Sequence, residues 1–586
     1  MSINILGLNC AYHESSVALI RDNKVIAAIE EERLNRVKHA KPALTGNPNE
    51  IPLQAMNLCL EMGNLLLSDI DIIAFSFNPL KRLHNNLKLD EQVQEGEWGT
   101  AAGEQKFYKK LVGIPEQIRA LGFNGQFMWV DHCVAHAASA YYPSPFTDAT
   151  VISIDGIGEY ESVTISAARE GKLFSMKEIS YPNSLGLLWE KVAQFMGMSE
   201  YDACKVMSLA SFGNSERFIG HFQRFVEIKP DGFTMDIDVC RFRSNDFSTF
   251  ETLFGLPALQ DRSAITSDYM DLAAALQQIT TDILLALTHY AAQINPSTNL
   301  CLAGGVALNC VANTAIFEQG PFENIYIQPA ANDAGTALGA ALHAYHNIFY
   351  GEKCASFEAN DTYLGPEYSE SEILATLGLF DVVYERADNI ADEVAALIAS
   401  GKVVGWFQGR MEFGPRALGN RSLLADPRDP EMVKRMNLLV KHREDHRPFC
   451  PSVLKEDAKA WFDIQKDADS AHYMLMAYPV NKEQRARIPA VVHVDGTSRI
   501  QLVSKTTNAK YHALISAFKK LTGVPLLLNT SFNDREPIVC SPEDALKTFL
   551  RTKIDFLVID NFIVRKKNPA PVQSKSMETA DVMPVS

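Results

Sequence analysis

The sequence lacks the features that mark several well-known classes of protein. None of its ten cysteines stands in a C-x-x-C pair, and several lie in apolar runs, so we expect buried thiols in a reducing compartment. No G-x-x-x-x-G-K-S/T motif is present, which excludes a P-loop enzyme. The first residues carry no signal-peptide pattern, and no run approaches the roughly 20 uncharged apolar residues of a membrane span. We therefore expect a soluble cytoplasmic protein.

Positive charge is also scarce. The chain has 55 Lys and Arg against 71 Asp and Glu, a net charge of −16. Such a balance argues against non-specific binding to nucleic acid or anionic membrane, so we expect neither as a partner. With 586 residues, the chain is too long for one hydrophobic core, and its composition is that of a globular protein. At least two domains are predicted.

Two histidines four residues apart suggest half of a metal site. His132 and His136 precede or lie in a run whose alanines predict a helix, and both imidazoles would then project from one face. Asp155 ends an apolar strand predicted over 149–154 and could add a carboxylate. The spacing alone is a weak signal, and a pair of buried, hydrogen-bonded histidines is the alternative interpretation.

Two similar meanders suggest an internally duplicated fold. Residues 3–29 and 151–179 each read as strand, polar turn, strand, tight turn and strand. Each begins with a turn whose polar side chains and N–H groups could hold a phosphate or a metal. Because meanders are common, two unrelated ones remain the alternative.

Glycine-rich turns follow two later strands. The strand predicted at 300–303 runs into Gly304-Gly305, and a helix is predicted over 306–317. The strand predicted at 325–328 ends in a turn that holds Asn332 and Asp333, before a helix predicted over 336–345. Glycines let a ligand approach the backbone closely, and a helix start offers free N–H donors to an anion. Asp333 thus lies where a metal or nucleotide would bind.

The amino-acid composition changes near residues 350–370, where Gly, Lys, Asn, Asp and Pro follow one another. This change predicts a domain boundary. We assign residues 1–355 to a first domain and 365–566 to a second. Residues 567–586 have no apolar periodicity and are predicted to be a disordered tail. The polar stretch 85–103 is expected to be a surface loop or insertion.

The second domain contains a basic cluster that is unusual in this acidic chain. Its cations follow one another closely, and several of them lie in glycine–proline loops: Arg410, Arg416, Arg421, Arg428, Lys434, Arg435, Lys441, Arg443 and Arg447. Arginine on a rigid loop suits bidentate phosphate binding, so we favour an anion site over a solvated basic face. Arg499 and Asn529 lie in two later polar segments, and the second of these segments follows an apolar strand.

Taken in order, these motifs resemble those of the NodU/CmcH family of O-carbamoyltransferases, which includes the tobramycin carbamoyltransferase. The resemblance covers nearly the whole chain. It rests on L-G-L-N…H-E-S-S-V-A-L, E-E-E-R-L-N-R-V-K-H, D-H-C-V-A-H-A-A-S-A, D-G-I-G-E, K-V-M-S-L-A, G-G-V-A-L-N, N-D-A-G, E-F-G-P-R-A-L-G-N-R-S, K-H-R-E-D-H-R-P-F, H-V-D-G-T-S-R-I-Q and N-T-S-F-N. Ser208, Ser211 and Phe212 depart from the usual K-V-M-G-L-A-P-Y-G pattern, which puts contacts near Lys205 in doubt.

The resemblance implies an α/β architecture: a duplicated actin/Hsp70-like (ASKHA) N-terminal domain and a YrdC-like α/β C-terminal domain. The C-terminal domain would convert carbamoyl phosphate and ATP into carbamoyl-adenylate. The N-terminal domain would bind this intermediate beside an iron ion and transfer the carbamoyl group to a hydroxyl. ATP would act with Mg²⁺, because attack on its α-phosphorus needs cationic support.

The same resemblance implies a role for individual residues. Those matched to the metal are His132, His136, Asp155 and Asp333. Those matched to the nucleotide are Lys205, Gly304, Gly305, Asn309, Asn332 and Asp333. His13 would lie near the transferring carbonyl as a general base, and the carbamoyl-phosphate and adenylation site would hold Arg416, Lys441, Arg447, Arg499 and Asn529. Two imidazoles and two carboxylates suit Fe²⁺ or another divalent transition metal.

Two other interpretations stay open. Another enzyme of the same superfold, a kinase or a threonylcarbamoyl-type transferase, is disfavoured by the basic cluster, the second domain and the negative charge. A non-catalytic nucleotide-binding protein is disfavoured by the intact metal and Arg/Lys sets. The acceptor is expected to be a hydroxyl on a small natural-product or sugar-type molecule. The oligomeric state is left open, with a homodimer as one option.

Overall fold

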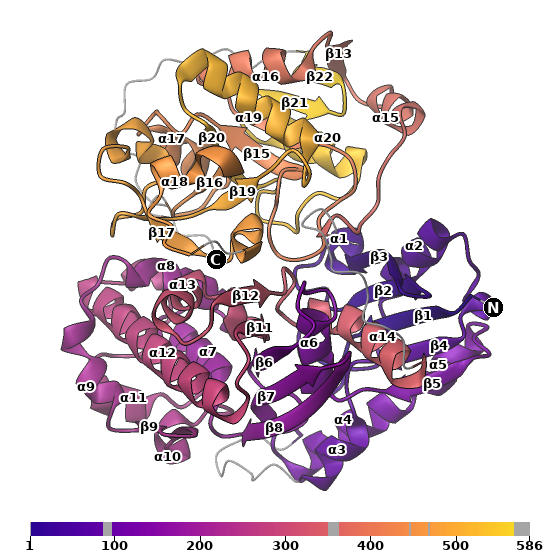
Figure 1. Cartoon of the computed structure of the whole chain (residues 1–586), viewed down its shortest axis with the longest axis vertical. Coiled ribbons are helices and arrows are strands. Elements are labelled where there is room, and N and C mark those ends of the chain that lie inside the picture. Colours follow the sequence, from indigo (N-terminus) through magenta and orange to yellow (C-terminus); the bar gives the residue numbers. More distant parts are fainter. Residues whose placement is uncertain (1, 86–95, 350–361, 445–446, 467–468, 568–586) are drawn as a thin grey trace.

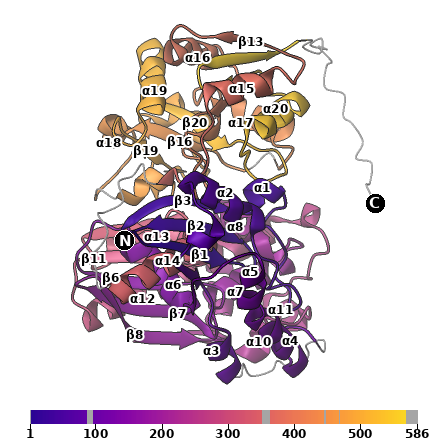
Figure 2. The same cartoon turned by 90° about the vertical axis from the view of Figure 1, so that its right-hand side faces the viewer.

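The computed structural model describes residues 2–85, 96–349, 362–444, 447–466 and 469–567. Figure 1 shows an α/β protein in two parts, with the C-terminal part above the N-terminal one, and Figure 2 shows the same arrangement from the side. Most of the predicted disordered tail, the centre of the predicted polar loop and the start of the predicted domain boundary lie outside the described residues.

The first sheet of the N-terminal part begins with the predicted meander. Its order is β3-β2-β1-β4-β5, with β1 antiparallel to β2 and parallel to β4. The strands are β1 (Asn4–Asn9), β2 (Ser16–Arg21), β3 (Lys24–Glu30), β4 (Ile72–Phe75) and β5 (Gln126–Trp129). Most of their residues are apolar and buried, as expected for strands that are covered on both faces.

The second sheet repeats this order. It runs β12-β11-β6-β7-β8, with β6 antiparallel to β7 and parallel to β11. Its strands are β6 (Ala149–Ile154), β7 (Glu161–Arg169), β8 (Lys172–Ser180), β11 (Asn299–Ala303) and β12 (Asn324–Ile327). The duplication predicted from the two meanders is therefore confirmed, since meander and parallel strands occupy equivalent places in both sheets.

Two helices pack against each other beside the sheets, α6 (His132–Tyr141) and α14 (Ala334–Phe349). Gly339 makes this packing close, because a Cβ there would lie 1.8 Å from the Ala135 carbonyl oxygen of α6. Gly7 on β1 allows an equally close approach to α14, at the Ala337 carbonyl oxygen. The helix predicted to start at residue 135 begins three residues earlier, so it includes both histidines.

The other helices of this part cover the sheets. They are α1 (Glu32–Asn35), α2 (Leu53–Gly63), α3 (Pro79–His84), α4 (Ala101–Val112), α5 (Ile114–Ala120), α7 (Leu185–Phe195), α8 (Ala203–Ala210), α9 (Ile219–Phe222), α10 (Ile237–Cys240), α11 (Ser248–Phe254), α12 (Ser267–Ile294) and α13 (Cys310–Gln319). A small hairpin, β9 (Val226–Lys229) and β10 (Gly232–Met235), lies among them.

Within the described residues, α12 is the one helix long and apolar enough to cross a membrane by length and composition. It is a core helix here: 61% of its most apolar window is buried, and it contacts α8 and α13. No disulfide joins the described cysteines, and eight of them are buried, as predicted.

The C-terminal part is built on one eight-stranded sheet of order β13-β22-β21-β14-β15-β20-β16-β19. Its strands are β13 (Val382–Arg386), β14 (Val404–Phe407), β15 (Arg421–Ala425), β16 (Cys450–Leu454), β19 (Gln501–Val503), β20 (Leu526–Ser531), β21 (Phe556–Ile559) and β22 (Phe562–Lys566). The surrounding elements are α15 (Glu370–Leu377), α16 (Ile390–Ala399), α17 (Met432–Arg435), α18 (Ala458–Trp461), α19 (Ala509–Thr522), α20 (Pro542–Arg551) and the pair β17 (Ala477–Pro479) and β18 (Thr497–Arg499).

Candidate active site

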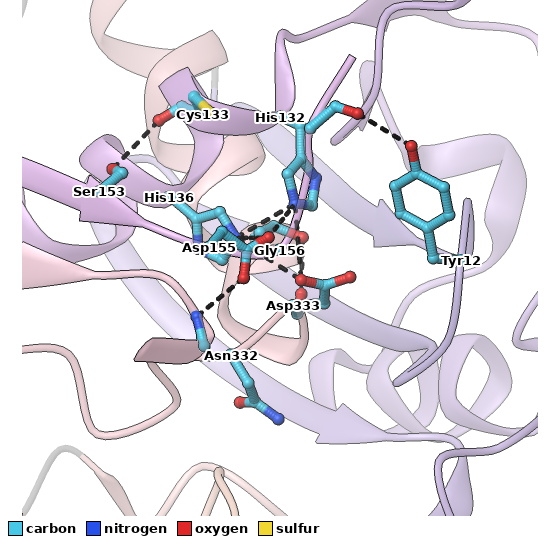
Figure 3. Close-up of polar contacts among 12 residues, drawn as sticks. Tyr12, His132, Cys133, His136, Ser153, Asp155, Gly156, Asn332 and Asp333 are labelled. Atoms are coloured by element: carbon cyan, nitrogen blue, oxygen red, sulfur yellow. Dashed lines mark hydrogen bonds and ion pairs between the residues drawn. The ribbon is translucent and has the colours of Figure 1, made fainter. Parts of the chain in front are cut away.

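The four predicted metal ligands converge in the buried centre of the N-terminal part (Figure 3). The Nε2 atoms of His132 and His136 lie 3.2 Å apart. Asp155 Oδ2 is 3.3 Å and 3.6 Å from these two nitrogens, and Asp333 Oδ1 is 3.5 Å and 3.6 Å from them. Both histidines are fully buried, and the Asp155 and Asp333 residues are 8% and 5% exposed.

This donor set fits a divalent cation. Ligands about 2.1 Å from a metal are about 3.4 Å from one another at tetrahedral angles, which matches the observed spacings. The backbone carbonyl of Ser76 lies 3.1 Å from His132 Nδ1 and can accept a hydrogen bond from an Nδ1–H group. This tautomer leaves Nε2 as the coordinating atom. A cation would also compensate the two buried carboxylates. Nitrogen and oxygen donors in equal number suit Fe²⁺, Mn²⁺ or Zn²⁺.

Glu159 holds the start of the histidine helix. Its carboxylate accepts hydrogen bonds from the backbone N–H of His132 at 3.0 and 3.1 Å and of Asn78 at 2.7 Å. The side chain is fully buried, and burial raises its pKa to about 7. Asp131, which precedes the helix, makes no cap hydrogen bond. The sequence analysis missed Glu159, although it lies in the D-G-I-G-E motif.

The two aspartates occupy turns that follow β6 and β12, the parallel strands on either side of β11. Asp155 follows β6 and accepts a hydrogen bond from the N–H of Gly305 at 2.9 Å. Gly304 has φ +92°, and a Cβ there would lie 2.1 Å from the Ile154 carbonyl oxygen. Burial raises the pKa of Asp155 and Asp333, but His132 and His136 outweigh it and hold both carboxyls ionised.

The helix predicted to open at the Gly-Gly turn begins later. A short 3₁₀ turn covers Gly305–Leu308, and α13 starts at Cys310. Asn309 caps α13 by accepting from the N–H of Ala312, and its amide donates to Gln277 at 3.0 Å. The prediction of a helix start at the glycines was therefore wrong. These two hydrogen bonds give the Asn309 side chain a structural role at the wall of the cavity described below.

His13 lies beside the quartet. Its Nδ1 is 3.6 Å from Asp333 Oδ2, and a quarter of the side chain is exposed. Burial lowers the pKa of His13, but Asp333 and Glu14 raise it to about 10 overall. Glu14 also accepts from the amide of Asn332, which connects this segment to the Asp333 turn.

One cavity of about 850 Å³ joins the metal quartet to the basic cluster. From the N-terminal part its wall includes His13, Asp155, Glu190, Lys205, Gly305, Asn309, Asn332 and Asp333. From the C-terminal part it includes Arg416, Arg447, Ser531 and Asn533. Lys205 is ion-paired with Asp202 at 2.7 Å. Burial raises the pKa of Glu190 to about 8. Glu190 was not predicted as a site residue, because it belongs to none of the motifs found in the sequence.

Of the five residues predicted for the carbamoyl-phosphate and adenylation site, Arg416 and Arg447 line the cavity, whereas Lys441, Arg499 and Asn529 are not among its lining residues. Burial and Arg499 lower the pKa of Arg416 to about 10, and Arg416 Nε has no hydrogen-bond partner among the described residues. Lys441 follows a π-turn (Met436–Val440) and donates to the Ser531 and Asn533 carbonyls at 2.8 and 3.0 Å. Burial, Arg443 and Arg447 hold the pKa of Lys441 well below its usual range.

Arg499 and Asn529 complete the cluster. Arg499 Nε lies 3.1 Å from Cys450 Sγ. Asn529 donates to Ser452 at 2.9 Å, while its Oδ1 is buried without a partner among the described residues. Arg443 was noted in the sequence but not selected; burial and Arg447 lower its pKa to about 9. Cations that lie this close together repel one another, and a bound anion would offset that repulsion.

Three arginines that the sequence analysis grouped with this cluster have other tasks. Arg421 is fully buried, stacks on Phe407 at 3.6 Å and donates to the Gln408 carbonyl. Arg410 donates to backbone carbonyls, and Arg428 pairs with Asp426. Their inclusion in the anion site was wrong, because these guanidinium groups are already engaged within the protein.

Fold and site together define a two-domain α/β protein in which a candidate metal centre and a candidate anion site share one cavity. The family model described as "Carbamoyltransferase N-terminus" matches residues 4–342, and "Carbamoyltransferase C-terminus" matches residues 395–566. The chain belongs to this family and is a carbamoyltransferase.

Relatives support the same assignment. The nodulation protein NolNO of Sinorhizobium fredii is 36% identical over 96% of this chain and 80% of its own length. The nodulation protein NolO of Bradyrhizobium diazoefficiens is 39% identical over 78% of this chain and 82% of its own. A solved HypF structure in a phosphate- and nucleotide-bound form covers 60% of this chain and 56% of its own at 14% identity. Its TM-score of 0.32 is too low to show a shared fold.

Proposed function

We propose that this carbamoyltransferase is an ATP-dependent O-carbamoyltransferase that works in two half-reactions. In the C-terminal domain, carbamoyl phosphate and ATP give carbamoyl-adenylate with release of phosphate and pyrophosphate. In the N-terminal domain, the carbamoyl group passes from this mixed anhydride to a hydroxyl of a small natural-product or sugar-type acceptor. The proposal assigns the duplicated part to the ASKHA superfold and the eight-stranded part to a YrdC-like domain, with 1–355 and 365–566 as their limits.

The basic cluster supports the first half-reaction. Arg416, Lys441 and Arg447 would bind the carbamoyl-phosphate dianion and stabilise charge on the departing phosphate. Asn529 Oδ1, a buried acceptor without a partner among the described residues, suits an N–H of the carbamoyl group. The α-phosphorus attack would use Mg²⁺ supplied with ATP.

The quartet supports the second half-reaction. A divalent metal, which we propose to be Fe²⁺ in the protein, would act when bound as a Lewis acid toward the adenylate phosphate. Lys205, Gly305 and Asn332 lie on the same cavity wall and would orient the nucleotide. His13 would move the acceptor hydroxyl proton at Nε2, which requires the imidazole to be neutral.

The observation that carries the proposal is that one cavity is lined both by Asp155 and Asp333, the two carboxylates of the quartet, and by Arg416 and Arg447. A kinase needs no second anion site of this kind. The test is pyrophosphate release from ATP with and without carbamoyl phosphate, measured with the metal-loaded protein. Release that does not depend on carbamoyl phosphate would refute the proposal. Candidate acceptors are then screened by mass spectrometry for a gain of one carbamoyl group.

A further inference from the structure

The E-E-E-R segment contacts the second domain at the loop that carries Arg416. Glu30 ends β3 and Arg33 lies in α1, at the face of the first domain nearest the second (Figure 1). The N–H of Gly414 donates to Glu30 Oε1 at 3.0 Å. The carbonyl of the same glycine accepts from an Arg33 terminal nitrogen at 2.9 Å. The N–H and the carbonyl of Gly414, a residue of the second domain, are thus both hydrogen-bonded to side chains of the first domain.

Glu30 and Arg33 form a preorganised pair. Arg33 bonds Glu30 Oε1 at 3.0 Å, and its other terminal nitrogen lies 2.7 Å from Glu32. Both side chains are almost fully buried, at 4% and 3% exposure. A buried ion pair contributes little net stability, since desolvation offsets the attraction. The pair instead fixes the orientation of both side chains, because each partner holds the other toward Gly414.

Gly414 also packs against the turn that leads to a metal ligand. Its φ is +117°, and a Cβ would lie 3.1 Å from the Pro329 carbonyl oxygen and 3.3 Å from Ala330. Asp333 follows in the same turn of the first domain. Arg416, two residues after Gly414, lines the shared cavity. Gly414 therefore connects the loop that carries Arg416 with the turn that carries Asp333.

A second arginine extends the contact. Arg36 donates to the Pro537 and Ile538 carbonyls, both at 2.7 Å, and pairs with Glu536 at 3.2 Å. Glu536, Pro537 and Ile538 line the cavity as well. The first domain thus holds the second-domain wall at two places, both of them through the segment from residue 30 to residue 36.

We propose that Glu30 and Arg33 are positioning residues that couple the two half-reactions. They hold the Gly414–Arg416 loop against the Asp333 turn, so that carbamoyl-adenylate passes between the sites without release to solvent. This inference rests on the proposed two-step function. No covalent step is added; the pair controls only whether the intermediate stays enclosed.

The test separates formation of the intermediate from its retention. Arg33→Lys keeps the charge but cannot hold Glu30, Glu32 and Gly414 together, and Glu30→Gln keeps an acceptor without the charge. Arg21→Lys is the matched control: Arg21 bonds Asn4 and the Gly63 carbonyl inside the first domain. Each full-length, metal-loaded protein is mixed with ATP and ¹⁴C-carbamoyl phosphate without acceptor. The pyrophosphate burst and the label retained after rapid desalting are both measured.

We expect the pyrophosphate burst of both variants to stay within about two-fold of wild type, while retained label falls about ten-fold. The control should keep both values. Unchanged retention in the variants would overturn the inference alone, as would parallel loss of burst and retention, which indicates a merely structural role. If wild type gives no burst that depends on carbamoyl phosphate, the proposed function itself fails, and that result is distinct from the other two.

Discussion

Glu159→Gln tests the metal centre without touching a ligand. Glu159 is fully buried, and both of its oxygens accept from the N–H of His132, the first residue of α6. Glutamine has nearly the same shape and can keep one oxygen there. Its amide nitrogen, however, would face a helix-start N–H and repel it. Loss of one charge-assisted bond and the new donor–donor contact together cost about 1–3 kcal/mol.

The cost falls on the metal site because α6 carries both histidines. A shifted helix start moves two Nε2 atoms that now lie 3.2 Å apart, with carboxylates at 3.3 to 3.6 Å. Groups that orient metal ligands typically contribute 10- to 100-fold in affinity, so we expect a loss of about that size. Pyrophosphate formation, which we assign to the other domain, should be nearly unchanged.

The assay is titration of chelator-treated protein with Fe²⁺ or Zn²⁺ against a competing chelator, with circular dichroism to check folding. Glu178→Gln is the control, since Glu178 on β8 is an exposed glutamate that bonds Tyr160. Wild-type metal affinity in the Glu159 variant would refute the reasoning. An equal loss in the control would refute it too, because the effect would then not depend on the helix start.

Four further predictions follow from the same contacts. Because burial and neighbouring cations depress the pKa of Lys441, pyrophosphate binding should be accompanied by proton uptake, and affinity should fall as pH rises through that depressed pKa; calorimetry in two buffers of different ionisation enthalpy detects this, and zero uptake contradicts it. Arg416→Ala should slow carbamoyl-phosphate-dependent pyrophosphate release about 100-fold, whereas an unchanged rate removes Arg416 from the site. Gly304→Ala should cost at least about 2 kcal/mol in denaturant unfolding, while Gly220→Ala, with open space around it, serves as the control. His13→Ala should slow carbamoyl transfer from preformed carbamoyl-adenylate, and a wild-type rate would exclude a proton-transfer role.

Local patterns were enough for much of the fold. In α12, apolar side chains recur at helical spacing over the whole of Ser267–Ile294, a pattern that is typical of a long amphipathic helix. Both meanders were visible as strands separated by polar turns, and the sheet orders confirm that they correspond. Boundaries near glycine were less certain: the predicted helix at 306–317 became a 3₁₀ turn and a later helix, since Asn309 supplies the cap.

The sequence by itself determined which chemical groups stand at strand ends and on one helix face, since spacing along the chain fixes these. It thereby identified His132 and His136 as a pair and Asp155 and Asp333 as turn residues. Only the tertiary structure decided that the four meet, because their convergence depends on how β6, α6 and α14 pack. It also decided that Arg416 faces a cavity whereas Arg421 is engaged inside the protein. Whether a charged side chain faces a cavity or is used up by contacts inside the protein depends on the fold, and no single stretch of sequence contains that information.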